Sequence, residues 1–177
     1  MTDDRFRPFD THLDQDTALA LLREATLGAD DGELFIERRR SESLVLDDGR
    51  GKTANYDASE GFGLRAVRGE RAGYAHATTI DEAALRRAVG TARLAVGDGG
   101  GTMAPGPQGT NVKLYSDVDP VAEASFPAKI DLLRQIDAFA RDLDPRVVQV
   151  SASLGASQQE VVILRRRRRR WSRTSAR

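Results

Sequence analysis

The chain has 177 residues, enough for a domain with a sizeable core, and its 40% hydrophobic and 31% charged residues are typical of a soluble globular protein. It contains no cysteine, which excludes disulfides and thiolate chemistry. No apolar run of about 18 residues occurs and the first residues do not indicate a signal peptide, so we expect a cytoplasmic protein without membrane contact.

The formal net charge of zero hides an uneven distribution. Residues 165–177 contain eight arginines and no acid. The other 19 basic residues face 27 acids, so residues 1–164 carry about −8. The body of the chain is acidic and only the tail is basic.

The predicted organisation is a flexible amino terminus (1–12), a folded domain (13–164) and an arginine-rich tail (165–177). The first element is a helix over 14–28, ended by Gly28. Alternating extended runs and turn residues then predict a meander of three or four antiparallel strands. The expected strands are 33–46, 52–57, 61–67 and 72–78, with turns at Asp47-Asp48-Gly49 and Arg68-Gly69-Glu70.

A second helix is expected over 80–96, with Thr79 and Glu82 at capping-box spacing. Residues 97–113, with six glycines and two prolines, predict a long loop. A third helix over 126–143 has Ser125 as its cap and ends at Asp144-Pro145. Its expected apolar face consists of Leu132, Ile136, Phe139 and Leu143.

Residues 148–154 alternate between apolar and polar types, which predicts a half-buried strand. A turn over Gly155–Gln159 should lead into a further strand over Glu160–Leu164. Together these elements predict an α/β fold of the α+β type, with a mainly antiparallel sheet and about three packed helices.

Two glycine-rich segments raise the question of nucleotide binding. Residues 61–66 fit a loose G-x-G-x-x-A pattern, but a turn between strands follows them where a dinucleotide site needs a helix. We interpret these glycines as easing strand packing. Residues 97–101 lack the Gly-Lys-Ser/Thr ending of a P-loop, and a flexible connector is the better interpretation.

No catalytic or metal-binding constellation is evident. A catalytic zinc needs about three protein ligands, and the only histidines are His12 and His76, neither of them in an H-E-x-x-H helix. We expect His76 to be a half-buried strand residue. A G-x-S-x-G elbow is also absent. We therefore assign no catalytic, cofactor-binding or metal-binding residue.

The arginine run Arg165–Arg170, followed by Trp171 and Arg173, could attract nucleic-acid phosphates without sequence preference. The body is acidic, however, and no groove-reading motif accompanies the run. Nucleic-acid binding is thus the weaker alternative to a disordered tail without a selected role.

Several segments, taken in order, resemble the TldD/PmbA family, and its TldD branch more than its PmbA branch. The most specific is residues 61–75, GFGLRAVRGERAGYA, which fits the family signature G-x-G-x-R-A-x-x-G-x-x-x-G-[FY]-A. The resemblance extends to Leu164. Its other segments are residues 32–35, 42–48, 114–120, 129–133 and 147–154.

The resemblance implies the amino-terminal domain of a zinc metallopeptidase that hydrolyses unfolded or peptide substrates, also called a modulator of DNA gyrase. It implies a PmbA-type partner subunit and zinc bound by an H-E-x-x-x-H helix and a later cysteine, neither of which this sequence contains. The chain is therefore expected to be truncated and inactive alone. The alternative is a stand-alone interaction module that binds such a partner, or a peptide, through a sheet edge.

The resemblance departs after Leu164, where six arginines interrupt the expected strand. A frameshift in a GC-rich gene produces such runs, so we expect residues 165–177 to be out of frame. An H-E-x-x-x-H motif in another frame of the downstream DNA would support this hypothesis, and its absence would contradict it.

Overall fold

The computed structural model describes residues 6–10, 12–97, 118–167 and 170–176, with side chains as far as Arg165. Its contacts form two compact units. Unit 1 comprises Met1–Arg38, Ser59–Tyr115 and Glu160–Arg177, and unit 2 comprises Arg39–Ala58 and Ser116–Gln159. None of the helices in the described ranges is long and apolar enough to cross a bilayer.

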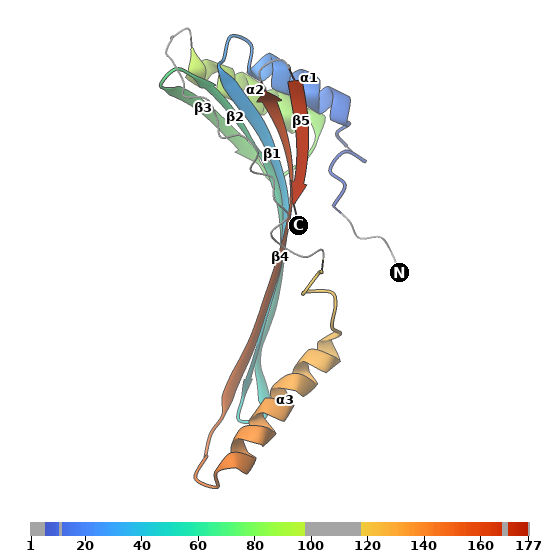
Figure 1. Ribbon diagram of the computed structural model, residues 1–177, viewed down its shortest axis with the longest axis vertical. Helices are drawn as coiled ribbons and strands as arrows, with labels where there is room; N and C mark the ends of the chain where they lie inside the picture. The colour runs from blue at the N-terminus through green and yellow to red at the C-terminus, as the bar shows by residue number, and fades with distance from the viewer. Residues whose placement is uncertain (1–5, 11, 98–117, 168–169, 177) are drawn as a thin grey trace. The chain divides into compact units, whose positions relative to one another are not determined.

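The described strands form an antiparallel sheet in the order β3-β2-β1-β4-β5 (Figure 1). The strands are β1 (Asp31–Asp47), β2 (Arg50–Arg68), β3 (Arg71–Ala77), β4 (Ser151–Arg167) and β5 (Arg170–Ala176). The helices are α1 (Gln15–Ala25), α2 (Glu82–Val96) and α3 (Phe126–Leu143). The predicted α+β fold is confirmed, including the meander of the first three strands.

Unit 1 has its core between the sheet and the helices α1 and α2. Alternate residues of β1, Leu34 and Ile36, are fully buried there, as a strand with one covered face requires. The other buried members come from both helices, β2 and β4, and include Leu22, Leu64, Leu85, Val89 and Leu164.

Unit 2 has a smaller core, built from Leu44 and Leu46 of β1 and Leu133 of α3. Partly buried side chains of Ile130, Ala152 and Leu154 pack against it. Figure 1 shows α3 running alongside the strands of this unit.

Both predicted hairpin turns are confirmed. Asp48 and Gly49 join β1 to β2 with φ of +53° and +72°, and Gly69 joins β2 to β3 with φ of +59°. Positive φ at both central positions of the first turn, and at the first central position of the second, suits the twist of a two-residue hairpin.

Two predicted interruptions of strands are wrong. The runs 52–57 and 61–67 belong to the single strand β2, and the predicted turn over Gly155–Gln159 lies within the continuous strand β4. Glycines and polar residues are compatible with a strand wherever neighbouring strands supply the hydrogen bonds, so local turn propensity was overridden there.

Helix caps follow the prediction in part. Ser125 caps α3 as expected, with its Oγ accepting a hydrogen bond from Ala128 N at 3.4 Å. The prediction for α2 was wrong, because Asp81 and not Thr79 is the cap, accepting from Ala84 N at 2.6 Å. Helix α1 ends at Ala25, before Gly28, which has φ of +75° in the following turn.

The predicted face of α3 is wrong. The buried residues of this helix are Lys129 and Leu133, whereas the expected apolar stripe is exposed. Its members Leu132, Ile136, Phe139 and Leu143 are 46%, 44%, 66% and 69% exposed. The helix therefore contacts the sheet through a face that includes an ion pair, described below.

Most of the predicted loop over 97–113 and part of the arginine-rich tail lie outside the described residues, and the predictions for them remain predictions. The same holds for the flexibility of residues 1–12, of which 6–10 and 12 are described.

Candidate functional site: charged side chains of β1 and β4

Between its two apolar pairs, strand β1 carries charged residues at 37–40 and 42, and three of them, Arg38, Arg40 and Glu42, alternate along the strand. Residues two apart in a strand point to the same face, so all three side chains point to the same face of β1 as the core residues Leu34, Ile36, Leu44 and Leu46. Each of the three is paired with an opposite charge from another part of the chain, and the pairs lie in the unit to which each residue belongs.

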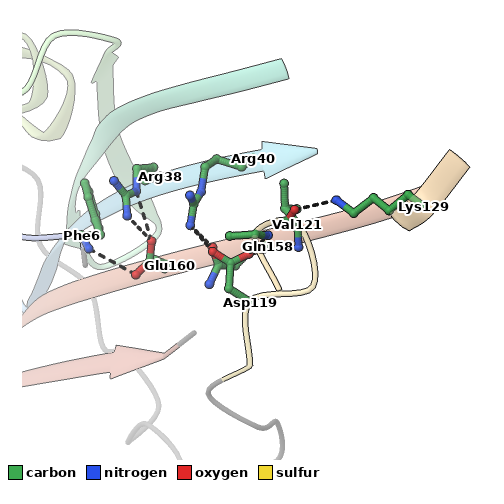
Figure 2. A network of polar contacts seen from close by, with 9 residues as sticks. Phe6, Arg38, Arg40, Asp119, Val121, Lys129, Gln158 and Glu160 are labelled. Carbon is green, nitrogen blue, oxygen red and sulfur yellow. Dashed lines mark hydrogen bonds and ion pairs between the residues drawn. The ribbon is translucent and has the colours of Figure 1, made fainter. Parts of the chain in front are cut away.

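In unit 1, the buried carboxylate of Glu160 on β4 accepts hydrogen bonds from Arg38 and from the backbone of Phe6. Arg38 donates from Nε at 3.1 Å and from Nη2 at 2.7 Å, and the backbone N–H of Phe6 donates at 3.2 Å. The Arg38 guanidinium also lies 5.5 Å from the Phe6 ring centroid, within cation–π range. Figure 2 shows these three residues together. The pair ties the segment before α1 to the sheet.

In unit 2, Asp119 organises the turn before α3. Its Oδ1 accepts from the backbone N–H groups of Val121 and Ala122 at 3.0 and 3.1 Å, while its Oδ2 accepts from Arg40 Nη2 at 2.6 Å (Figure 2). Arg40 also contacts the side-chain oxygen of Gln158 on β4. An aspartate that caps its own turn and accepts from an arginine fixes this turn to β1.

Lys129 of α3 makes the second link to β1 in unit 2. Its Nζ donates to the backbone oxygen of Val121 at 2.6 Å and to Glu42 Oε2 at 3.1 Å, and lies 3.0 Å from Glu42 Oε1. The Lys129 side chain is 5% exposed and that of Glu42 13%. A charge this deeply buried must be paired, which explains why α3 presents Lys129 to the sheet.

The β1–β2 turn is also held to unit 2. Gln149 donates to Asp47 Oδ1 at 3.1 Å, and this hydrogen bond is the largest cause that lowers the pKa of Asp47. Arg141 of α3 contacts Asp48 and donates to Asp137 at 3.1 Å, and these carboxylates raise the pKa of the guanidinium. The turn is thus fixed by polar contacts on both of its aspartates.

These paired charges stabilise the fold and do not form a reactive site. Each of the three carboxylates faces a cation, and those of Glu160 and Asp119 also accept hydrogen bonds from backbone N–H groups. None of the three is therefore placed as a free base or nucleophile. In the parts of the chain that the structure describes, no three His, Cys, Asp or Glu side chains converge as metal ligands. The described residues do not fit a catalytic zinc.

The two histidines occupy exposed positions. The expectation that His76 would be half-buried is therefore wrong. On β3 its ring stacks against that of Tyr74, with the ring centroids 5.8 Å apart. The alternation of β3 places the small residues Gly73, Ala75 and Ala77 towards the covered face and His76 on the other.

The glycines of segment 61–75 permit close packing. A Cβ at Gly63 would lie 2.8 Å from the Tyr74 hydroxyl, and one at Gly73 would lie 2.1 Å from the backbone oxygen of Ala92 on α2. Segment 61–66 lies within β2 and leads into the hairpin to β3, with Gly63 opposite His76. The structural interpretation of these glycines is supported, because the helix that a dinucleotide site needs is not there.

Comparison with known families decides the kinship of the chain. Residues 32–96 match the PmbA/TldA metallopeptidase domain 1, and residues 119–172 match the PmbA/TldA metallopeptidase central domain. The chain belongs to the TldD/PmbA family. The central-domain match continues past Leu164 into the arginine-rich segment, further than the resemblance seen in the sequence.

Relatives within the TldD/PmbA family include two proteins named metalloprotease TldD homolog. The one from Buchnera aphidicola (Acyrthosiphon pisum) is 34% identical over 83% of this chain and 31% of its own length. The one from Haemophilus influenzae is 33% identical over 74% of this chain and 28% of its own length. The chain thus spans about a third of these TldD relatives.

Solved structures share the fold at low identity. TldE from Thermococcus kodakarensis has a TM-score of 0.65 at 18% identity, covering 90% of this chain and 37% of that one. A modulator of DNA gyrase from Bacteroides thetaiotaomicron has a TM-score of 0.63 at 16% identity, covering 90% and 38%.

The TldD/PmbA motif segments contain both members of the pair Lys129–Glu42 and one member of the pair Arg40–Asp119. Glu42, Asp119 and Lys129 each lie in a segment that carried the family resemblance, yet their pairing was missed in the sequence analysis. One signal was available, since Lys129 is one of only three lysines in an arginine-rich chain. A buried lysine on a helix needs a partner of opposite charge.

Proposed function

We propose that the chain supplies the amino-terminal framework of a TldD-type metallopeptidase and has no peptidase activity alone. The observation that carries the proposal is the ordered match to the first and central family domains, together with relatives named metalloprotease TldD homolog. The described residues contribute a sheet with packed helices and paired charges, which suits a framework. The cytoplasmic location and zinc in the complete enzyme belong to the same proposal.

In this proposal the catalytic residues come from sequence outside the chain. The chain contains no H-E-x-x-x-H segment and no cysteine. The framework would help to enclose an unfolded peptide and would contact a PmbA-type partner subunit. Support for a partner comes from the structural similarity to TldE.

The first test is a peptidase assay of the purified chain with unfolded casein and added zinc. No cleavage above the buffer rate is expected. Zinc-dependent cleavage that disappears in the His12→Ala/His76→Ala variant would overturn the proposal, because these are the only histidines. Cleavage that the double variant retains would point to a contaminating protease and call for repeated purification before the assay is scored.

The second test addresses the partner. A tagged chain co-expressed with a PmbA-type protein is expected to retain it on the affinity resin at moderate salt. A matched control uses Gly73→Ala, which should disturb the packing of β3 on α2 and weaken any interaction that needs a folded unit 1. Failure of the wild-type chain to retain the partner would contradict this part of the proposal.

A further inference from the structure

Within the described part of the chain, strand β2 has an edge over its first eleven residues with which no other strand pairs. Strand β3 pairs with β2 only from Phe62 to Arg68, so among the described strands none covers residues 50–60 on that side. All of residues 50–60 are exposed. An uncovered edge presents unpaired backbone N–H and C=O groups and accepts another strand readily.

The sequence of this edge is chemically complementary to itself when reversed about Tyr56. In the segment Gly51–Gly61, GKTANYDASEG, residues equally distant from Tyr56 match in type. The matched pairs are Asn55 with Asp57, Ala54 with Ala58, Thr53 with Ser59, Lys52 with Glu60, and Gly51 with Gly61.

We propose that two copies of the chain pair through this edge as antiparallel strands, with Tyr56 opposite Tyr56. A twofold axis through the central pair generates every other pair twice, which is the symmetry of most homodimers. The occupant of the edge is therefore a second copy of this chain, and the observation that selects it is the complementarity of charge and size along the segment.

Each face of the paired strands gains favourable neighbours. In an antiparallel pair, directly opposite side chains lie on the same face, about 4.5 to 5.5 Å apart at Cβ. One face carries the two tyrosines, flanked by small alanines that leave room for the rings, with Lys52–Glu60 at both ends. The other face carries Asn55–Asp57 and Thr53–Ser59, which can exchange hydrogen bonds.

The charges at the ends are available for exchange. Lys52 contacts Asp47 at 3.4 Å while its side chain is 64% exposed, so solvent already screens this pair. Moving Lys52 to Glu60 of a second copy costs little. A contact of one strand pair is smaller than a standard interface of about 1,600 Å², so the dimer is expected to be reversible and concentration-dependent.

Charge reversal tests the register. Lys52→Glu places two glutamates opposite each other at both ends of the pair, and Glu60→Lys does the same with two lysines. Each single variant is expected to raise the dimer dissociation constant roughly 10-fold or more in sedimentation equilibrium, because like charges directly opposite are destabilising. The double variant Lys52→Glu/Glu60→Lys restores opposite charges and is expected to restore the dimer.

The matched control is Arg87→Glu, the same change of charge at an exposed position of α2, which should leave the dimer unchanged. A wild-type chain that stays monomeric at all concentrations overturns the proposal. So does an association that the single variants leave unchanged, or one that the double variant does not recover.

Disulfide trapping gives an independent readout, because the chain has no cysteine. Ala54→Cys/Ala58→Cys retains Tyr56 and places a thiol opposite each partner thiol, so oxidation is expected to yield a covalent dimer. Either single variant lacks a facing thiol and should remain monomeric on a non-reducing gel. Leu94→Cys, 86% exposed on α2, controls for random collision. Equal trapping in the single, double and control variants would refute the register.

Discussion

Lys129 of α3 and Glu42 of β1 form the most deeply buried charge pair that the structure describes, with Nζ 3.0 Å from Oε1. Removing the lysine leaves a buried carboxylate without its cation. Lys129→Met is therefore expected to lower the free energy of unfolding by about 3 to 5 kcal/mol, measured by urea denaturation with circular dichroism.

A double variant that also replaces Glu42 separates the effect of the unpaired charge from the effect of the changed packing. Lys129→Met/Glu42→Leu removes both charges and should regain most of the lost stability, since apolar side chains often replace a buried ion pair without cost. Arg134→Met breaks an exposed pair with Asp131 on the same helix and should change stability by no more than about 0.5 kcal/mol. Equal effects of Lys129→Met and Arg134→Met would contradict the burial argument.

Two glycines of unit 1 give opposite predictions for the same substitution. A Cβ at Gly73 would lie 2.1 Å from the backbone oxygen of Ala92, whereas one at Gly90 in α2 would meet nothing within 4 Å. Gly73→Ala should destabilise by about 1 to 3 kcal/mol or more, because β3 and α2 must separate. Gly90→Ala should stabilise by about 0.5 to 1 kcal/mol through helix propensity. The thermal unfolding midpoints of the two variants, measured in parallel, should therefore shift in opposite directions.

The elements that the sequence predicts best are those with a local cause. The hairpin turns at Asp48-Gly49 and Gly69 need positive φ, and the third helix begins at its serine cap, so local chemistry fixes both. The length of β4 has no local cause, because its middle segment Gly155–Gln159 contains turn-forming and polar residues. Pairing with neighbouring strands keeps that segment extended.

The candidate site shows the same division. That the chain contains no H-E-x-x-x-H segment and no cysteine follows from the sequence directly, and the assignment of no catalytic residue stays a prediction. The ion pairs Arg38–Glu160 and Lys129–Glu42 join residues that are 122 and 87 positions apart in the sequence. A local sequence pattern cannot indicate which of such distant residues come into contact. The apolar stripe of α3 misled the prediction of its buried face, because hydrophobic periodicity does not show which partner covers a helix.

That exposed stripe predicts a surface that binds apolar probes. Phe139 and Leu143 are 66% and 69% exposed on the same side of α3, beside Leu132 and Ile136. The native chain should bind the dye ANS, and Phe139→Ser/Leu143→Ser should reduce both the fluorescence and any precipitation at high concentration. Arg87→Glu, at an exposed position of α2, should leave the dye signal unchanged. Undiminished fluorescence in the serine variant would place the apolar surface elsewhere.

The cap of α1 predicts a specific dependence of stability on pH. The Asp14 carboxylate accepts hydrogen bonds from the Thr17 side chain, which is the largest cause, and from the backbone N–H groups of Asp16 and Thr17, and these lower its pKa below 3.8. Because the folded pKa is depressed, the ionised cap stabilises the protein above about pH 3.8, and this contribution is lost as the pH falls through the folded pKa. Asp14→Ala should therefore lower the thermal midpoint clearly at pH 7 and much less near pH 2. Asp14→Asn keeps a capping oxygen without a titrating group, so the gap between the Asn and Ala variants should stay constant with pH. A gap between wild type and Asp14→Ala that is the same at both pH values would show that the ionised carboxylate does not stabilise the helix.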